Sequence, residues 1–568
     1  MTDALRVGNC SGFYGDRISA MREMLEGGPL DVLTGDYLAE LTMLILGRDK
    51  AKDPTLGYAK TFLRQLEECL GLAIDKGVQI VSNAGGQNPA GLAAAIHDLS
   101  ERLGLGATVA YVDGDDVTAR AADLGLPESL AANAYLGAFG IAEGVRSGAN
   151  VVISGRVTDA SVIIGPAIAR FGWGREDYDA LAGATVAGHI IECGTQATGG
   201  NFAFFTEIAD LLHPGFPIAE IRADGSSVIT KHPGTAGAVT VDTVTAQLLY
   251  EIGAQRYYGP DVTTRLDSIR LSQEGPDRVL VDGITGEAPP ATLKVSCNAL
   301  GGYRNQVAMV LTGLDIDAKA DLARRGFEQA LKTQPAQLDW ELTKTAVADA
   351  DTEEGASAKL IVTARDKDPK VVGRAFSNAG VEIALASYPG FHSMTPPADA
   401  TAYGVFTPGF IPQESVEHRV TLPDGTQQSI DAPGSYLTET AIDVPAIAPA
   451  PGGETVRAPL GRVAGARSGD KGGSANIGLW ARDDAGFSWL ASTLTTDKVR
   501  ELLPEAADLT IHRTVFPNLR AVNFLIEDLL GEGVAYQARF DPQAKGLGEW
   551  LRSRYLDIPR SLLPQEGH

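Results

Sequence analysis

The sequence contains few cysteines and no clustered metal-binding motif. Its four cysteines, Cys10, Cys69, Cys193 and Cys297, have no C-x-x-C spacing, which argues against a zinc ribbon and against a disulfide framework. The eight histidines form neither an H-x-H nor an H-E-x-x-H motif, which are common signatures of a zinc centre. We therefore expect no metal site and no cofactor that the sequence requires, and the need for a divalent metal stays open.

Positive charge and long hydrophobic runs are also scarce. The formal net charge is −24, with 48 Lys and Arg against 72 Asp and Glu. Nucleic acids and anionic membranes are bound through clustered Lys and Arg, so neither is an expected partner. The apolar stretch at residues 41–46 is too short to span a bilayer, and residues 1–12 lack the basic and apolar regions of a signal peptide. We expect a cytoplasmic protein.

The first part of the chain alternates short apolar runs with helical patterns. Strands are expected at residues 5–9, 31–34, 78–82, 107–112 and 150–154. This alternation is typical of βα units, so we predict an α/β fold whose sheet is mainly parallel and has flanking helices. In such sheets, ligands bind beyond the carboxyl ends of the strands.

The rest of the 568 residues divides into two further regions. From residue 221 to 444 the runs become shorter and mixed α+β, with helices expected at 243–252 and 321–332, and an internal boundary is expected near 220–240. Residues 445–456 are rich in Pro, Ala and Gly and are predicted to be a linker between a large domain, 1–444, and a small one, 457–560. The small domain should be α+β, with strands at 460–466, 475–481 and 509–514 and helices at 496–503, 519–530 and 546–555.

Polar residues follow four of the expected parallel strands. We predict that these residues converge on one ligand-binding cleft, although Asn and Asp in such loops also cap helices and shape turns. The residues concerned are Asn9, Ser11, Asp16, Arg17, Asp36, Asn83, Arg156 and Asp159.

A glycine-rich segment at residues 188–201 carries the most distinctive motif. A helix ending at Gly194 would place His189 and Cys193 four residues apart on one face, so a nucleophilic Cys193 is one hypothesis and a packed structural cysteine the alternative. The negative end of the helix dipole raises the pKa of a thiol there, which favours the structural alternative. Glu192 is the better acid/base candidate, and its pKa should be raised unless a salt bridge to Arg156 or to another cation lowers it and makes the residue structural. Further ligand contacts are predicted from Gln196, Thr198 and Asn201.

Three other motifs are candidates for binding an anion. Cys10 lies in a G-x-C-x-G string, which fits a turn of backbone N–H groups better than a nucleophile elbow. Lys231 and His232 adjoin a tight turn, where a solvated loop is the alternative interpretation. Arg467 and Lys471 lie in a predicted glycine-rich loop of the small domain and should bind an anion or face the large domain.

In these motifs the chain resembles the acyclic terpene utilisation (AtuA) family. The similarity lies in N-C-S-G-F-Y-G-D-R at 9–17, T-G-D-Y-L-A-E at 34–40, N-A-G-G at 83–86, G-R-V-T-D-A-S at 155–161, the segment 192–201 and K-H-P-G at 231–234. The small domain resembles the ferredoxin-like module often fused to this family, through R-S-G-D-K-G-G at 467–473.

The resemblance implies a role in catabolism of acyclic terpenes through branched acyl-CoA thioesters. A retro-aldol cleavage of a 3-hydroxy-3-isohexenylglutaryl-CoA-like thioester is the leading reaction, and the alternatives are a hydrolase or hydratase and a non-catalytic acyl-CoA-binding scaffold. The expected partner is an acyl thioester or a carboxylate, and a homo-oligomer is expected. Cleavage needs a base and donors for an enolate, so Asp36, Asp159 and Glu192 are candidate bases.

Overall fold

The computed structural model describes residues 4–443 and 445–564, and it divides the chain into two compact units. One unit comprises Met1–Asn298, Phe406–Val534 and Gln543–His568, and the other comprises Ala299–Val405 and Ala535–Pro542. The domain and linker boundaries expected from the sequence stay predictions. Within the described residues, no helix is both long enough and apolar enough to cross a membrane.

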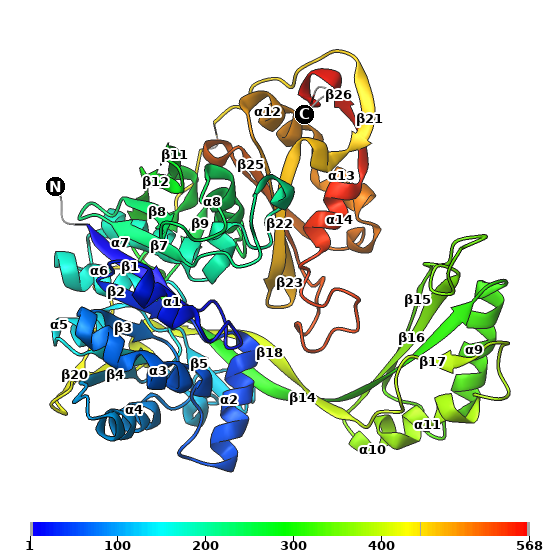
Figure 1. Ribbon diagram of the computed structural model, residues 1–568, viewed down its shortest axis with the longest axis horizontal. Helices are drawn as coiled ribbons and strands as arrows, with labels where there is room; N and C mark the ends of the chain where they lie inside the picture. Colours follow the sequence, from blue (N-terminus) through cyan, green and yellow to red (C-terminus); the bar gives the residue numbers. More distant parts are fainter. Residues whose placement is uncertain (1–3, 444, 565–568) are drawn as a thin grey trace. The chain divides into compact units, whose positions relative to one another are not determined.

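The largest sheet of the first unit has five parallel strands at its centre (Figure 1). In spatial order these are β1 (Leu5–Asn9), β2 (Val32–Gly35), β3 (Gln79–Ser82), β6 (Val151–Ser154) and β4 (Val109–Asp113). They are buried on both faces, as expected for strands read from short continuous apolar runs. The carboxyl ends of β1, β2, β3 and β6 therefore lie side by side at one edge of the sheet.

Antiparallel strands extend this sheet on both sides, so the fold is mixed α/β rather than mainly parallel. On the β1 side these are β7 (Pro217–Ile221), β8 (Ser227–Lys231), β12 (Arg278–Asp282) and β11 (Arg270–Gly275). On the β4 side they are β19 (Arg419–Thr421) and β20 (Gln427–Ser429). The expectation of a mainly parallel sheet therefore holds for the central strands alone.

Helices with recognisable end signals cover this sheet. Helix α4 (Pro89–Leu103) begins at Asn88, whose side chain accepts a hydrogen bond from the Gly91 N–H at 3.0 Å, and ends at Gly104 with φ +68°. The other helices here are α1 (Ala20–Gly27), α2 (Glu40–Lys52), α3 (Lys60–Lys76), α5 (Phe139–Arg146), α6 (Ser161–Phe171), α7 (Tyr178–Ile191) and α8 (Val241–Leu248).

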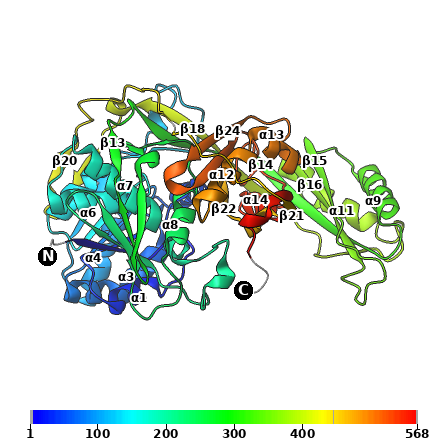
Figure 2. The ribbon, with the colours of Figure 1, turned by 90° about the horizontal axis from the view of Figure 1, so that it is seen from above.

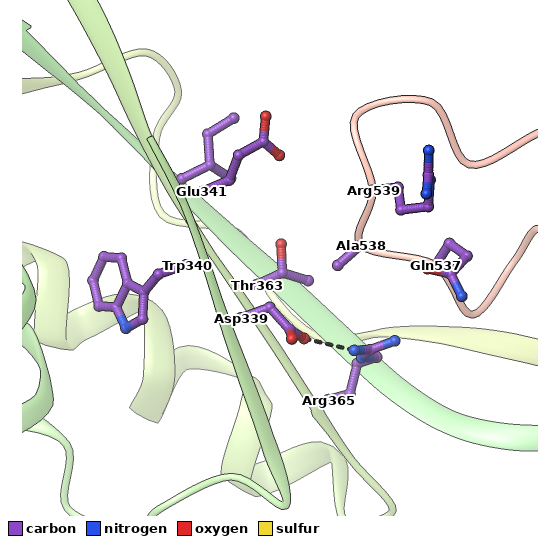
Figure 3. Close-up of a pocket in the computed structure, with 9 residues that line it drawn as sticks. Asp339, Trp340, Glu341, Thr363, Arg365, Gln537, Ala538 and Arg539 are labelled. Carbon is purple, nitrogen blue, oxygen red and sulfur yellow. Dashed lines mark hydrogen bonds and ion pairs between the residues drawn. The ribbon is translucent and has the colours of Figure 1, made fainter. Parts of the chain in front are cut away.

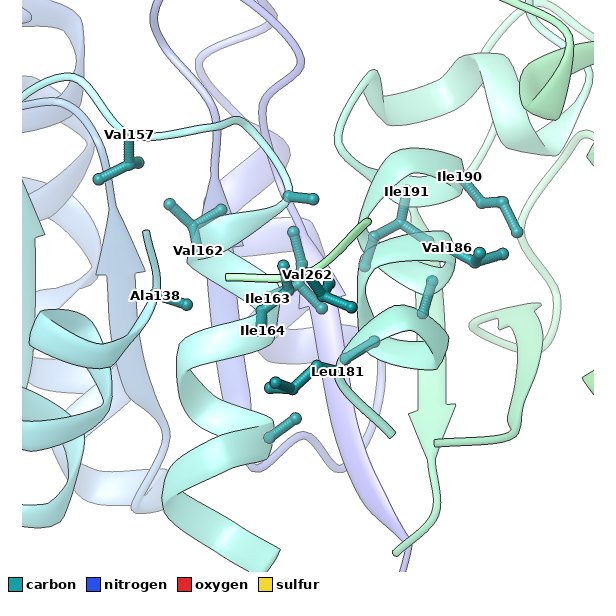
Figure 4. Close-up of a cluster of buried hydrophobic side chains, with 14 of the residues drawn as sticks. Ala138, Val157, Val162, Ile163, Ile164, Leu181, Val186, Ile190, Ile191 and Val262 are labelled. Atoms are coloured by element: carbon teal, nitrogen blue, oxygen red, sulfur yellow. The ribbon is translucent and has the colours of Figure 1, made fainter. Parts of the chain in front are cut away.

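Part of the hydrophobic core lies between α6 and α7 (Figure 4). Val162 and Ile163 of α6 face Leu181 and Ile191 of α7, and all four side chains are fully buried. From Leu181 to its end at Ile191, α7 is buried on all sides. A helix enclosed in this way is held by packing over its whole length, so it fixes the position of residues at its carboxyl end.

The C-terminal region forms a separate sheet with the order β22-β23-β25-β24, covered by helices (Figures 1 and 2). The elements are β22 (Ala464–Lys471), β23 (Ser474–Ala481), α12 (Asp484–Thr493), α13 (Thr496–Leu502), β24 (Ile511–Phe516), β25 (Ala521–Ile526) and α14 (Leu547–Ser553). A two-stranded sheet joins β21 (Thr455–Pro459) to β26 (Tyr555–Pro559). Trp480 of β23 stacks on Phe202 of the large sheet's region, with ring centroids 6.2 Å apart, so the two regions share one core.

Two predictions for this region are wrong. Residues 519–530 contain a strand, β25, instead of a helix, because a short apolar run that is buried on both faces cannot be assigned to helix or strand by its pattern. Residues 460–462 form a short helical turn before β22, so the strand begins later than expected.

The second unit is an antiparallel sheet with helices on one face. Its sheet contains β15 (Gln337–Thr343), β16 (Ser357–Asp366), β14 (Thr292–Thr312) and β17 (His392–Ser393), and β18 (Thr401–Pro412) also pairs with β14. Phe327 of α9 (Ile316–Ala330) and Phe376 of α11 (Arg374–Glu382) form its core, together with α10 (Pro369–Val372). Both β14 and β18 continue into the first unit, where β14 pairs with β5 (Ala131–Ala134). The first unit also contains a small sheet of β9 (Arg256–Tyr258), β10 (Thr263–Arg265) and β13 (Thr285–Glu287).

Candidate functional site

Asp36 and Asn83 lie together at the carboxyl ends of β2 and β3. The Asn83 side chain donates a hydrogen bond to Asp36 Oδ1, and its own Oδ1 accepts one from the Tyr37 N–H at 2.8 Å. Asp36 Oδ1 also accepts the Leu38 N–H at 3.0 Å. Both side chains are buried, so this network fixes the carboxylate of Asp36 in one orientation.

Arg156 and Asp159 join this group from the loop after β6. Arg156 Nη1 donates to Asp159 Oδ1 at 2.8 Å, and the Arg156 guanidinium lies 4.3 Å from the centroid of the Tyr135 ring. Burial raises the pKa of Asp36 well above its usual value, the charge of Asp159 raises it further, and the charge of Arg156 lowers it. Asp36, Asn83, Arg156 and Asp159 therefore lie close together, and that they line one ligand-binding cleft stays a prediction.

Glu192 adds a third carboxyl group to this cluster. It follows directly after α7, and its Oε1 lies 3.2 Å from Nδ1 of His189, one turn earlier in the helix. Burial raises the pKa of Glu192, while the hydrogen bond from His189 lowers it; the charges of Asp159 and Arg156 act in opposite directions. The pKa of Glu192 thus shifts in the expected direction, although His189 lies within ion-pair distance and lowers it.

Of the two cysteines near the site, Cys10 is buried and Cys193 is partly buried. Burial raises the pKa of Cys193 well above its usual value, and the charges of Glu192 and Glu251 raise it further. A Cβ on Gly12 would lie 2.6 Å from the Cys193 carbonyl carbon, so the two backbones pack directly against each other. Burial also raises the pKa of Cys10. A thiol that stays protonated is a poor nucleophile, so the geometry favours the structural alternative for Cys193.

Several residues that were predicted to bind ligand are held by protein partners. The Asn9 side chain donates to the Ile191 and Glu192 carbonyls at 2.7 and 2.9 Å, which closes the end of α7. The Thr198 hydroxyl donates to the Gly215 carbonyl at 2.7 Å. The Ser11 hydroxyl donates a hydrogen bond to the Phe13 carbonyl, and Asp16 accepts one from the Gly12 N–H. Arg17 forms an ion pair with Glu23. In contrast, Oε1 of Gln196 is buried without a hydrogen-bond partner.

Lys231 and His232, at the end of β8, also have structural contacts. Lys231 Nζ lies 3.0 Å from Asp277 and donates to the Thr235 carbonyl at 2.6 Å. His232 Nε2 lies 2.9 Å from the Met24 carbonyl, and burial lowers the pKa of this imidazole. These partners lie outside the carboxylate cluster.

Arg467 and Lys471 were predicted to bind an anion or to face the large domain, and both contact residues of the large sheet's region. Arg467 belongs to strand β22 rather than to a loop, because the glycine-rich segment is a β-hairpin that turns at Gly472 and Gly473. Arg467 Nη1 donates to the Asn201 carbonyl at 3.1 Å, and its guanidinium lies 4.7 Å from the centroid of the Tyr250 ring. Lys471 Nζ donates to the Glu251 carbonyl at 2.8 Å.

Sequence reasoning missed three residues of this site. Tyr257 and Glu251 lie close enough to Glu192 and Cys193 for their charges to affect one another, but no motif marks them. Asp115 follows β4, and its Oδ2 accepts hydrogen bonds from the Arg156 N–H at 2.9 Å and the Asn133 side chain at 2.8 Å. The pattern that found the other loops, a polar residue after a parallel strand, also applies to Asp115.

The pKa of Asp115 gives a pH-dependent test of this arrangement. Burial raises it from 3.8 to about 7, so the folded chain binds the Asp115 proton more tightly than the unfolded chain between these pH values. Stability from this group is therefore greatest below pH 3.8 and is lost as the pH rises to about 7. Relative to Asp115→Asn, the free energy of unfolding should fall by on the order of 4 kcal/mol across that range. Urea unfolding of both proteins between pH 4 and 8 measures this difference.

Asp116→Asn is the matched control for that experiment. The side chain of Asp116 is 44% exposed and lies 3.7 Å from Lys50, so its replacement should change the free energy of unfolding by less than about 1 kcal/mol. If the free energy of unfolding changed with pH in the same way for the natural chain and for Asp115→Asn, Asp115 would not titrate in this range.

The second unit contains a cavity of about 250 Å³ that none of the predicted residues lines (Figure 3). Asp339, Glu341 and Thr363 line it from the sheet, and Gln537 and Arg539 line it from the segment 535–542. Asp339 pairs with Arg365 across neighbouring strands. Among all the described side chains, there is no group of three or more His, Cys, Asp or Glu residues that could hold a metal ion.

Comparison with known families agrees with the resemblance seen in the motifs. A family model described as acyclic terpene utilisation family protein AtuA matches residues 5–422. A second one, described as AtuA ferredoxin-like domain, matches residues 458–557. No curated protein matches the chain.

Proposed function

The chain belongs to the acyclic terpene utilisation (AtuA) family, and from this premise we propose that it is a catabolic enzyme of branched acyl-CoA thioesters or related carboxylates. Membership links the chain to acyclic terpene utilisation. The proposed reaction is retro-aldol cleavage of a tertiary 3-hydroxy acyl thioester. The observation that supports it is the cluster of Asp36, Asp159 and Glu192 around the buried Arg156.

The cluster offers both functions that this cleavage needs. A base must take the proton of the 3-hydroxyl group while the C–C bond breaks and its electron pair forms a thioester enolate. Burial raises the pKa of Asp36 and Glu192 above the usual value of a carboxyl group, which favours proton uptake by these groups. Arg156 is the proposed contact for the enolate or for a substrate carboxylate, because a fixed cation stabilises charge that develops in the transition state.

The small domain is the proposed contact for the phosphates of CoA. Arg467 and Lys545 lie 4.7 and 4.5 Å from the centroid of the Tyr250 ring, and Lys471 is bonded to the next residue, Glu251. Cationic groups that gather in a chain of net charge −24 are suited to an anionic ligand. Arg467 also lies near Cys193, which places these cations close to the carboxylate cluster.

Product analysis with 3-hydroxy-3-methylglutaryl-CoA tests the proposal. We expect a ketone product and acetyl-CoA in equal amounts, and Glu192→Gln should lower turnover by roughly a hundredfold or more while the chain stays folded. Asp179→Asn serves as control, because Asp179 bonds to the Gly286 N–H and lies outside the cluster. Free CoA without a C–C cleavage product would instead indicate hydrolysis. Saturable binding without turnover would indicate a scaffold subunit.

A further inference from the structure

The contact between His189 and Glu192 uses one polar atom of each side chain. Nδ1 of His189 and Oε1 of Glu192 are 3.2 Å apart, while Nε2 of His189 and Oε2 of Glu192 are buried and have no hydrogen-bond partner. The two residues are 4% and 5% exposed. Buried polar atoms in native proteins are nearly always bonded, so two orphaned atoms on one pair point to a group that the bound ligand supplies.

The geometry fixes what His189 can do. A carboxylate that accepts the Nδ1 hydrogen leaves Nε2 as an unprotonated acceptor, which is the arrangement of a histidine base held by an acid. The imidazole is further held by the ring of Tyr257, whose centroid is 5.3 Å away, and by the enclosed helix α7. The side chain therefore has little freedom to turn Nε2 elsewhere.

The surrounding charges favour proton uptake by the pair. Burial alone lowers the pKa of an imidazole, but the hydrogen bond to Glu192 and its charge raise the pKa of His189 above its usual value. Glu251 raises it further, and Lys471 opposes this. On the other side, Asp159 and Arg156 act on Glu192. Charges of the carboxylate cluster and of the small domain's Lys471 therefore both reach this pair.

We infer that His189 is the catalytic base that takes the proton of the substrate's hydroxyl group through Nε2, and that Glu192 is the residue that positions it. This inference rests on the proposed function and changes its assignment of the base. The hydroxyl proton passes to Nε2, the C–C bond breaks, and its electron pair forms the thioester enolate. The enolate carbon then takes a proton back from the imidazolium, so no other reactant is needed.

Binding measurements test the inference separately from catalysis. The probes are 3-hydroxy-3-methylglutaryl-CoA and its deoxy analogue, 3-methylglutaryl-CoA, and each affinity is measured by rapid mixing on a time scale shorter than one turnover. Because Nε2 accepts the hydroxyl hydrogen, the natural chain should bind the hydroxylated probe at least tenfold more tightly. In His189→Phe this preference should disappear while the affinity for the deoxy probe stays within about threefold, which also shows that the variant is folded.

Turnover separates a catalytic role from a purely structural one. His189→Gln keeps a hydrogen-bonding side chain of similar reach, so it should retain much of the binding preference and lose turnover by at least a hundredfold. Equal binding of both probes by the natural chain would overturn the inference and leave the proposed acyl-CoA function standing. Turnover of His189→Gln within threefold of the natural chain would also overturn it. Failure to bind either probe would overturn the inference and the proposed function together.

Discussion

Replacement of Arg156 by glutamine is expected to abolish most turnover and to destabilise the fold. The Arg156 side chain is 3% exposed, bonds to Asp159 and lowers the pKa of both Asp36 and Glu192. Without this cation, the buried carboxyl groups of Asp36 and Glu192 and the partly buried one of Asp159 would lose a positive charge that opposes their mutual repulsion. We expect turnover to fall by at least about a hundredfold, as for loss of one stabilising donor, and the free energy of unfolding to fall by about 3 kcal/mol.

The pH dependence of this effect follows from its cause. Arg156 stabilises ionised carboxylates, so the stability difference between the natural chain and Arg156→Gln should shrink as the pH falls and Asp36 and Glu192 take up protons. Urea unfolding at pH 5 and pH 8 measures it. Arg102→Gln is the control, because the ion pair with Glu67 is at least 50% exposed on both sides and should contribute less than about 1 kcal/mol. If the two variants lost the same free energy of unfolding, Arg156 would not stabilise the buried carboxylates as described.

The sequence predicts the parallel centre of the large sheet well. The strand expected at residues 5–9 is β1, and the other four parallel strands lie within two residues of their expected positions. Short apolar runs bounded by glycine and polar residues identify such strands because both faces are buried. The same property misled the assignment of β25, since an apolar run without alternation also suits a buried helix.

The second unit was not predicted, and its long strands explain why. The sequence predicted only short mixed runs between residues 221 and 444, whereas β14 runs from Thr292 to Thr312. Gly301 and Gly302 interrupt the apolar pattern of this strand, and Gly302 has φ +147°. The two glycines therefore suggest a turn in the sequence, although the strand continues through them in the structure. Pairing with β16 over ten residue pairs, a contact distant in sequence, holds this strand together.

The sequence predicts which loops meet at the candidate site, but it does not predict which side chains pair there. The polar residues after β2, β3 and β6 meet because adjacent parallel strands end at the same edge of the sheet. The pairing of His189 was assigned to Cys193, four residues on, whereas the structure pairs it with Glu192, three residues on. Since α7 ends at Ile191, the spacing rule of a continuous helix no longer applies to Cys193. The contributions of Glu251 and Tyr257 depend on tertiary contacts, which local patterns do not encode.

Two buried asparagines attach the small domain to the segment that carries Tyr250 and Glu251. The Asn476 side chain of β23 donates to the Leu249 carbonyl at 2.9 Å and to Asn523 Oδ1 at 2.6 Å, and it accepts the Glu251 N–H at 2.8 Å. Asn523 of β25 donates to the Gly253 carbonyl at 2.9 Å. Both asparagines are fully buried. This segment lies beside the proposed phosphate contacts, so we expect its attachment to affect both stability and the proposed ligand binding.

Asn476→Leu should therefore be among the most damaging substitutions in the small domain. It keeps a side chain branched at Cγ but leaves the Leu249 carbonyl, the Glu251 N–H and Asn523 Oδ1 without their partner, at a cost of about 1–3 kcal/mol for each buried group. We expect the free energy of unfolding to fall by at least about 3 kcal/mol, and acyl-CoA binding to weaken because Tyr250 loses its support. Chemical denaturation and titration calorimetry measure the two effects. The same substitution at Asn378, an exposed residue of α11, should change stability by no more than about 0.5 kcal/mol. If Asn476→Leu were as mild as Asn378→Leu, the asparagine pair would contribute little and hydrophobic packing around Trp480 alone would hold the small domain in place.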